Sequence, residues 1–388
     1  MASDAAELAV ELGTALIDAI FASKPLARVK ELAKDAPLWF QAPESGWSAL
    51  HAAAFREDAE LIKFLLIHGA VWNAVDALGN TAADIALSLN NAECYALVRD
   101  AGVRTEILLR VLADKAEADV DMTGDDDKAS EIVGDSGAIR IKAQDSTAAG
   151  STGTFLDSKL VFKTDERGQE ICVVQAGEDE VGVMMGWETD IMKRTVDALC
   201  LDHAELEDPG LRVLNIGHGL GIVDTYFQSL STKPTQHVIV EPHPDVLAHM
   251  KAKGWYDKPG VTILEGKWQD FVDTKLLEDG GFDVVYTDTF SEDYAQLYKF
   301  FQQVPNLLRS STSRFGFFHG LGATNATFYD VYTRVSELHL EDVGLAVEWT
   351  DVDVNLDPET WGETRKYFSL PIYRMPVASW PAYDAMET

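Results

Sequence analysis

A glycine-rich turn after an apolar run is the part of this chain best suited to binding a ligand. Residues 211–216 read LRVLNI, which fits a buried strand, and Gly217, Gly219 and Gly221 follow at alternate positions. Glycines at a strand-to-helix turn let the backbone approach a ligand closely, and an acidic residue about 20 positions further on can accept hydrogen bonds from ribose hydroxyls. Glu241 ends the next β-rich run. The pattern indicates a nucleoside-bearing cofactor, and a merely tight turn is the alternative.

The spacing of the glycines distinguishes two classes of cofactor site. Dinucleotide-binding folds use G-x-G-x-x-G, whereas this chain has Ile222 where the third glycine of that pattern would fall. The G-x-G-x-G spacing instead resembles the first motif of S-adenosylmethionine-dependent methyltransferases.

The elements around this turn alternate between strands and helices. A hairpin of LVFKTD and QEICVVQ begins at Leu160, and a helix is predicted over residues 187–203. Alternation of this kind predicts a parallel, doubly wound sheet with its ligand at the carboxyl ends of the strands. The main strands are predicted at residues 211–216, 236–241, 261–264, 282–287, 314–318, 343–349 and 366–373.

The N-terminal part of the chain contains two copies of one motif. GWSALHAAA at 46–54 and GNTAADIAL at 79–87 are 33 residues apart, the period of the ankyrin repeat with its T-P-L-H-x-A signature. The proline of that signature is alanine in both copies. Residues 6–36 and 90–112 are predicted to close the two ends, because about three units are the minimum for a stable stack. An unrelated array of helical hairpins is the alternative.

A polar segment separates the two regions. From Asp114 to Asp127 the chain carries seven acidic residues and one lysine, and residues 129–153 are rich in Ser, Thr, Gly and Ala. Such a segment cannot bury enough apolar surface to order itself, so we predict a flexible tether, with an acidic docking tail as the alternative. The predicted division is an ankyrin-like domain at 1–112, a linker at 113–153 and a catalytic domain at 154–388.

Composition restricts the partners. The 388 residues carry a formal net charge of −32, which disfavours nucleic acid and anionic membranes and favours a basic partner. No apolar run approaches the roughly 18 residues of a membrane-spanning helix. Cys94, Cys172 and Cys200 have neither metal nor disulfide spacing, which indicates a reduced intracellular compartment.

Several further motifs point to one family. They are VMMGWETDIM at 183–192, EPH at 241–243, WQD at 268–270, YTDTF at 286–290 and FFHGLGATN at 317–325. Together with the glycine turn they resemble guanidinoacetate N-methyltransferase, and the added ankyrin-like region resembles the type IV protein arginine N5-methyltransferases. The resemblance implies a Rossmann-like class I methyltransferase domain with a seven-stranded, mostly parallel sheet and S-adenosyl-L-methionine as cofactor. It also implies an antiparallel last strand at 367–373 and a location in the cytoplasm and nucleus.

The resemblance further implies which residues surround the cofactor. The glycine turn would wrap its methionine portion and ribose, and Glu241 would take the ribose hydroxyls. Asn215 stands where the family often has an acidic or other polar residue; its amide can still form hydrogen bonds but cannot balance the cofactor's ammonium charge. The implied cofactor residues are Met184, Glu188, Met192, Gly217, His218, Gly219, Leu220, Gly221, Ile222, Val223, Glu241, Pro242, His243, Trp268, Gln269 and Asp288.

Glu188 and Asp288 are the candidate substrate residues. Two carboxylates gripping the terminal nitrogens of a guanidinium would draw positive charge toward them and free the lone pair of the internal nitrogen. Asp288 is the first candidate for the base and His319 the second. The structural alternatives are a helix-dipole contact for Glu188, a turn cap for Asp288 and a backbone-bonded ring for His319. Three tryptophans could wall an arginine channel or belong to the core: Trp187, Trp349 and Trp361.

These expectations combine into an enzyme that methylates the internal guanidino nitrogen of arginine in a basic protein, such as a ribosomal protein. A small-molecule guanidino methyltransferase is one alternative, although it would not need an ankyrin-like region. An ankyrin scaffold with an inactive methyltransferase domain is the other. Type I and II arginine methyltransferases use a hairpin with two glutamates, and only Asp288 and Glu292 come near that arrangement. No cluster of histidines has metal-ligand spacing, so no metal is predicted.

Overall fold

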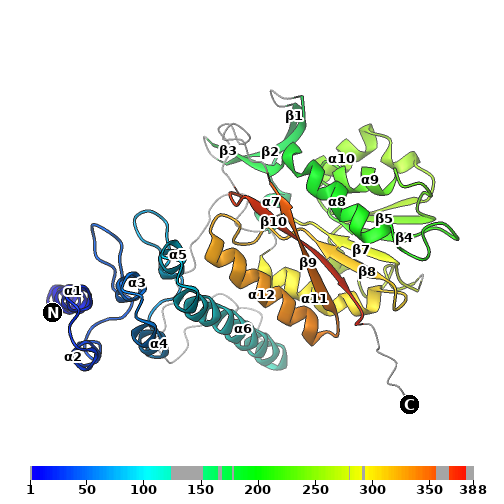
Figure 1. The fold of residues 1–388 in the computed structure, drawn as a ribbon. Coiled ribbons are helices and arrows are strands. Elements are labelled where there is room, and N and C mark those ends of the chain that lie inside the picture. Colours follow the sequence, from blue (N-terminus) through cyan, green and yellow to red (C-terminus); the bar gives the residue numbers. More distant parts are fainter. Residues whose placement is uncertain are drawn as a thin grey trace, which may run out of the picture. The chain divides into compact units, whose positions relative to one another are not determined.

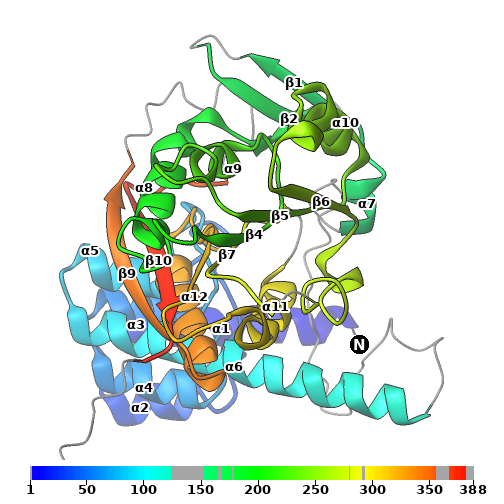
Figure 2. The same ribbon diagram turned by 90° about the vertical axis from the view of Figure 1, so that its right-hand side faces the viewer.

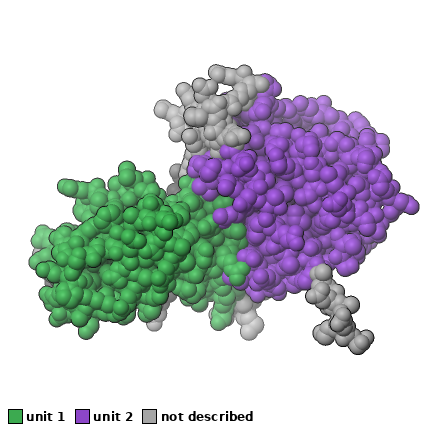
Figure 3. Space-filling view, viewed as in Figure 1, with its two compact units in different colours: residues 1–132, 321–335 green, residues 133–320, 336–388 purple. Residues whose placement is uncertain are grey.

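A computed structural model describes two compact units, which Figure 3 shows in different colours. Unit 1 comprises residues 1–132 and 321–335, and unit 2 comprises residues 133–320 and 336–388. No helix in the described part of the chain is long and apolar enough to cross a membrane. The described residues are 2–123, 152–164, 168–176, 179–278, 280–290, 293–354 and 367–381.

Unit 1 is a series of short helices whose starts are fixed by capping boxes. Ser48 caps α3 (Ala49–Phe55) and Thr81 caps α5 (Ala82–Ser88), each in a reciprocal pair with the residue three positions on. Alanines on α3 and α5 are fully buried, so neighbouring helices approach closely. The other helices are α1 (Ala2–Phe21), α2 (Leu26–Leu32), α4 (Ala59–Ile67) and α6 (Ala92–Thr123).

Helix α6 corrects the predicted start of the linker at residue 113. It continues to Thr123, because the alanine, glutamate and lysine residues of the acidic stretch have high helix propensity despite their charge. The remaining part of the predicted linker, residues 124–151, lies outside the described residues. Unit 1 is completed by residues 321–335, which include the first part of α12 (Ala326–Asp342).

Unit 2 is built on a seven-stranded sheet with the order β6-β5-β4-β7-β8-β10-β9 (Figure 1). The first five strands of that order are parallel, and β10 is antiparallel to both β8 and β9. The predicted mostly parallel sheet and its antiparallel end are confirmed. The strands are β4 (Arg212–Ile216), β5 (Gln236–Glu241), β6 (Val261–Glu265), β7 (Val284–Thr287), β8 (Arg314–Phe317), β9 (Ala346–Asp353) and β10 (Ile372–Ser379).

The last strand lies later in the chain than predicted. Residues 367–373 were expected to form it, but β10 runs from Ile372 to Ser379. Pro376 argues against a strand from sequence, because proline cannot donate to a ladder. In the structure Pro376 lies opposite Trp349 of β9, where β8 does not pair with β10, so it occupies an edge-like position that tolerates proline.

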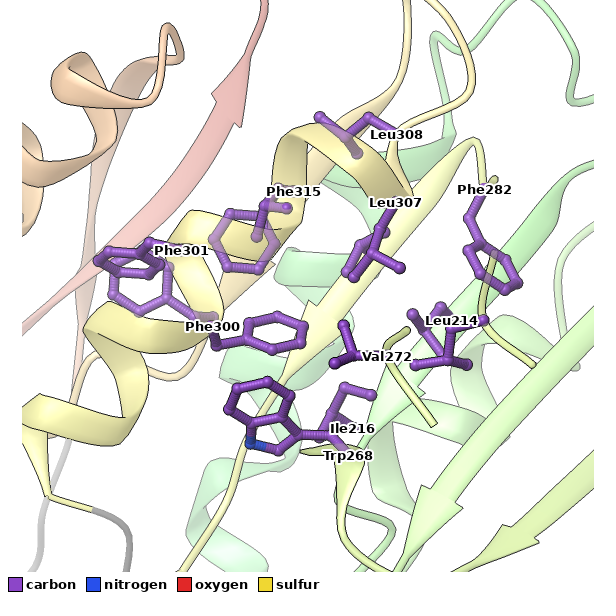
Figure 4. Close-up of a cluster of buried hydrophobic side chains, with 14 of the residues drawn as sticks. Leu214, Ile216, Trp268, Val272, Phe282, Phe300, Phe301, Leu307, Leu308 and Phe315 are labelled. Carbon is purple, nitrogen blue, oxygen red and sulfur yellow. The ribbon is translucent and has the colours of Figure 1, made fainter. Parts of the chain in front are cut away.

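Helices cover both faces of the large sheet (Figure 2). On one face, α8 (Thr189–Cys200) and α9 (Ile222–Phe227) share a buried cluster with β4 and β7, and α10 (Pro244–Ala252) packs beside them against β5. On the other face, Phe300 and Phe301 of α11 (Tyr294–Leu307) pack against Leu214, Ile216 and Phe315 of the sheet (Figure 4). Strand β4 is therefore buried on both sides, as a central parallel strand requires.

A smaller three-stranded sheet precedes this core. The predicted hairpin is confirmed as β1 (Leu160–Thr164) and β2 (Glu170–Ala176), and β3 (Asp179–Met184) adds a third antiparallel strand. The predicted helix over 187–203 begins as a 3-10 turn, η3 (Gly186–Glu188), and continues as α8. The short elements are α7 (Thr152–Leu156), η4 (Trp255–Asp257) and η5 (Trp268–Asp270).

Candidate active site

The glycine turn lies between β4 and α9, at the carboxyl end of the central strand. Its φ angles are +91° at Gly217, +59° at Gly219 and +70° at Gly221, a region that residues with a side chain rarely adopt. A Cβ atom at Gly217 would lie 2.0 Å from the backbone oxygen of Asp288. The N–H of Asp288 donates to the carbonyl of Ile216 at 2.9 Å. Because Gly217 has no side chain, Asp288 at the end of β7 can lie directly against the turn.

The Glu241 carboxylate supports the turn from the end of β5. Its Oε2 accepts the backbone N–H groups of His218 at 2.9 Å and Gly219 at 3.4 Å. Its Oε1 accepts the N–H of His243 at 2.8 Å. Burial raises the pKa of Glu241, and these backbone donors oppose the rise. Because each carboxylate oxygen has two lone pairs, Oε1 can accept a further donor beside the one from His243.

A buried polar network lies under the turn. Asn215 Nδ2 donates to both carboxylate oxygens of Asp224 at 2.9 Å and to the carbonyl of Gly217 at 2.9 Å. The same carboxylate meets His218 Nδ1 at 2.6 Å and His237 Nε2 at 2.9 Å. Burial alone would raise the pKa of Asp224, but the two histidines outweigh it and lower that pKa to about 2. Asn215 therefore anchors the turn to Asp224. The sequence analysis did not identify Asp224 as part of the site.

Glu188 and Asp288 form an electrostatically coupled pair. Burial raises the pKa of Glu188 well above its usual range, and the neighbouring charge of Asp288 raises it further. Burial also raises the pKa of Asp288, to about 7. Two like charges in a poorly solvated place resist ionising together. A bound cation would therefore stabilise the ionised forms of both carboxyl groups.

Glu188 lies at the N-terminus of α8, so its position also fits the structural alternative, a contact with the helix dipole. Glu188 precedes α8 but makes no side-chain bond to the start of that helix. Its Oε1 instead accepts a hydrogen bond from the hydroxyl of Tyr367, which opposes the rise in the Glu188 pKa. Tyr367 was missed because the sequence pattern assigned it to the last strand, whereas it lies in the segment before β10.

His319 lies in an aromatic cluster after β8. Its backbone N–H donates to the hydroxyl of Tyr373 at 3.1 Å. Its ring centre is 5.0 Å from that of Trp349 and 6.0 Å from that of Phe317. This bond fixes the backbone of His319 and does not involve its ring, so both the structural alternative and the role as second-candidate base stay predictions.

The apolar residues of the predicted cofactor set divide between two clusters. Met192 and Val223 are buried in the cluster between the sheet and helices α8 and α9, and Ile222 packs against it. Leu220 packs against the cluster under α10. The side chain of Met184, at the end of β3, lies outside the described residues.

The residues predicted around the adenine have clear protein partners. His243, which follows Pro242, caps α10 by accepting the N–H of Asp245 at 3.1 Å. Trp268 is 5% exposed and belongs to the core of Figure 4. Gln269 is on the surface, where its amide donates to Gln296 at 3.2 Å. Their role toward a cofactor stays a prediction.

Trp187 lies beside the carboxylate pair. It directly precedes Glu188, and its ring centre is 5.9 Å from that of Tyr367. Trp349 packs on His319, as described above. Trp361 and Glu292 lie outside the described residues.

The turn fits a nucleoside-bearing cofactor. Its glycines leave the backbone open to close approach, and Glu241 has acceptor capacity at the adjacent strand end. Two buried polar atoms at the turn, His218 Nε2 and Asn215 Oδ1, also have no protein partner. In the described part of the chain, no three His, Cys, Asp or Glu side chains gather as a metal site would require.

Comparison with known proteins agrees with this two-part architecture. Residues 15–122 match the family model for ankyrin repeats, three copies, so the predicted ankyrin repeats are confirmed. Residues 179–315 match the family model for guanidinoacetate N-methyltransferase. Spermidine synthase from Thermotoga maritima has a TM-score of 0.39 with 14% identity, covering 57% of this chain and 72% of that chain. Fold and family models together define a Rossmann-like methyltransferase domain joined to ankyrin repeats.

Curated relatives match nearly the whole chain. Protein arginine N-methyltransferase 2 of Cryptococcus neoformans is 40% identical over 381 residues, covering 94% of this chain and 94% of that protein. The protein of the same name from Emericella nidulans is 35% identical, covering 98% of this chain and 100% of that protein. The chain belongs to the protein arginine N-methyltransferase 2 family.

Proposed function

We propose that this protein transfers a methyl group from S-adenosyl-L-methionine to the internal (δ, N5) guanidino nitrogen of an arginine in a protein. The observation that carries the proposal is the coupled pair of Glu188 and Asp288 beside the glycine turn. The family names of its relatives support arginine methylation in general, and the pair supports the choice of nitrogen.

The proposed cofactor site consists of the glycine turn and Glu241, whose geometry fits a nucleoside-bearing cofactor. The turn from Gly217 to Val223 would hold the methionine portion and ribose, with Glu241 accepting from the ribose hydroxyls. When bound, S-adenosyl-L-methionine supplies an electrophilic methyl group on a sulfonium.

The carboxylate pair prepares the acceptor nitrogen. A guanidinium delocalises its lone pairs, and two carboxylates on the terminal nitrogens concentrate positive charge there. The internal nitrogen then has a more available lone pair. On accepting the methyl group that the bound cofactor would supply, the internal nitrogen must lose its proton. Asp288 can accept that proton, because a pKa of about 7 suits a base near neutral pH.

The acceptor is a basic protein, possible examples being ribosomal proteins, in the cytoplasm and nucleus. The supporting observation is the formal net charge of −32, which attracts positively charged partners and repels nucleic acid.

Product analysis tests this proposal directly. The full chain is incubated with labelled S-adenosyl-L-methionine and a cell extract, and the modified arginine is fragmented. We expect methyl on the internal nitrogen, and the main product being ω-methylarginine would refute the mechanism. Free guanidinoacetate serves as a competing acceptor, because its efficient methylation would favour a small-molecule enzyme.

A further inference from the structure

The first ankyrin copy shows how one repeat is tied to the next. His51 is the third residue of α3, and its Nδ1 meets the Ser48 hydroxyl at 2.8 Å. Its other ring nitrogen, Nε2, meets the carbonyl of Asn80 at 3.1 Å, in the loop that precedes α5. His51 therefore closes its own helix start and contacts the following copy.

The second copy has Asp84 at the equivalent position. Asp84 Oδ2 accepts the N–H and the hydroxyl of Thr81, each at 2.7 Å, so it also closes its own helix start. The other partners of Asp84 lie far along the chain. Oδ1 accepts the hydroxyl of Thr327 at 2.9 Å, and Oδ2 accepts the side-chain amide of Asn325 at 2.7 Å. In the first copy, His51 contacts the loop of the following repeat. In the second copy, Asp84 contacts residues 321–335 in the equivalent way.

Residues 321–335 are packed into unit 1 by further contacts. Thr327 is fully buried, and its hydroxyl oxygen lies 3.1 Å from that of Thr81. The ring of Phe328 meets that of Trp72 edge-on at 5.7 Å. The hydroxyl of Tyr95 on α6 donates to the Asp330 carboxylate.

Glycine at position 102 allows α12 to come close to α6. A Cβ atom at Gly102 would lie 2.8 Å from both Trp72 and Val331. A side chain there would push the start of α12 away from the repeats. The repeats and residues 321–335 therefore share one continuous packed surface.

An aspartate at position 84 suits the contact between α5 and residues 321–335 better than a histidine would. Its carboxylate lies at the N-terminus of α5, and it contacts Asn325, the residue that caps α12 by accepting the N–H of Phe328 at 3.1 Å. A negative charge is favourable near helix N-termini. Four donors from Thr81, Asn325 and Thr327 converge on it, which a carboxylate can accept and an imidazole cannot.

We propose that Asp84 is a positioning residue that fastens residues 321–335 to the last ankyrin repeat. This segment begins two residues after His319 in the chain. The ankyrin array thus holds a segment whose chain continues into unit 2 at both of its ends.

Hydrogen exchange on the full chain tests the fastening without using activity. In Asp84→Ala, the amides of residues 321–335 should exchange about tenfold faster or more, as expected for the loss of hydrogen bonds to a charged group. The matched control is Asp58→Ala, which removes the cap of α4 at Leu61 but has no contact with this segment. Unchanged protection in Asp84→Ala, or an equal loss in Asp58→Ala, would overturn the proposal.

A second variant covers the case in which Asp84→Ala does not fold. Thr327→Val removes one donor to Asp84 and leaves the start of α5 intact, so it should loosen the same amides by a smaller factor. Unchanged exchange in Thr327→Val alone would refute the fastening. Where Asp84→Ala does fold, the double variant should exchange no faster than Asp84→Ala alone. Additive effects would mean that the two residues act independently and would refute the fastening.

A kinetic measurement tests the positioning role and rests on the proposed function. On a short arginyl peptide, too small to span a docking surface, Asp84→Ala should lower kcat severalfold while Asp58→Ala leaves it unchanged. An unchanged kcat with lost protection would refute positioning. If wild type does not methylate arginine at all, the proposed function fails while the exchange result still decides the fastening.

Discussion

Asp288→Asn is the substitution that most directly tests the proposed chemistry. Asparagine keeps the shape and hydrogen-bonding capacity of Asp288 but cannot take up a proton or carry a negative charge. Loss of a general base typically costs about 100- to 10,000-fold in turnover. We expect a loss of that size in kcat, measured with labelled cofactor and a protein acceptor, with cofactor affinity within a few fold of wild type.

The pH profile separates a base from a residue that only binds. Burial raises the pKa of Asp288 to about 7, and the ionised form is the active one, so kcat/KM should rise about tenfold per pH unit up to pH 7 and then level off. The residual activity of Glu188→Gln should keep this acidic limb, since that variant leaves Asp288 in place. The residual activity of Asp288→Asn should lose it.

The same substitution should make the folded protein more stable at alkaline pH. The pKa of Asp288 rises from 3.8 to about 7 on folding, so its contribution to stability is fully present below about pH 4 and is lost as pH rises through 7. Three pKa units correspond to about 4 kcal/mol, and because Asp288 is partly exposed we expect about half of that.

Melting temperatures at pH 8 and pH 4 measure this effect. Asp288→Asn should melt several degrees above wild type at pH 8, since about 2 kcal/mol corresponds to a few degrees in a chain of this size. The difference should nearly vanish at pH 4. Near-normal turnover of Asp288→Asn, a retained acidic limb, or no gain in stability at pH 8 would each contradict the reasoning.

Three further substitutions test the residues around the pair. Tyr367→Phe removes the hydroxyl donor to Glu188, so turnover should fall about tenfold and the melting temperature by a few degrees, as for one hydrogen bond to a charged group; an unchanged rate would exclude a role in holding Glu188. Glu241→Ala should weaken cofactor binding by about 2 kcal/mol in calorimetry, and unaltered affinity in a folded variant would remove Glu241 from the site. Gly217→Ala places a Cβ 2.0 Å from the Asp288 carbonyl at a φ of +91°, and such strain costs about 1–3 kcal/mol. Its melting temperature and its turnover should both fall, whereas normal values for both would show that the turn and Asp288 move independently.

The sequence was sufficient to predict which strand ends meet. The glycines after β4 and Glu241 at the end of β5 were recognised by local pattern, and Asp288 after β7 by the resemblance to a known family. Parallel strands bring their carboxyl ends to one edge of a sheet, so the pattern and that rule together predict a shared site. The repeated motif and its 33-residue period likewise identified the ankyrin repeats, because both depend on residues close together in the chain.

Only the tertiary structure decided which distant side chains act on those residues. The Tyr367 hydroxyl on Glu188, the Asp224 network under the turn and the Asp84 contacts with residues 321–335 join groups far apart in sequence or turned inward by their rotamers. The observed β10 begins at Ile372, so Tyr367 lies before the strand and not in it. Hydrophobic periodicity specifies elements and their buried faces, but it carries no information about which polar group a buried carboxylate meets. Those partners are set by how the elements pack, and here they fix the charge and position of the residues proposed to do the chemistry.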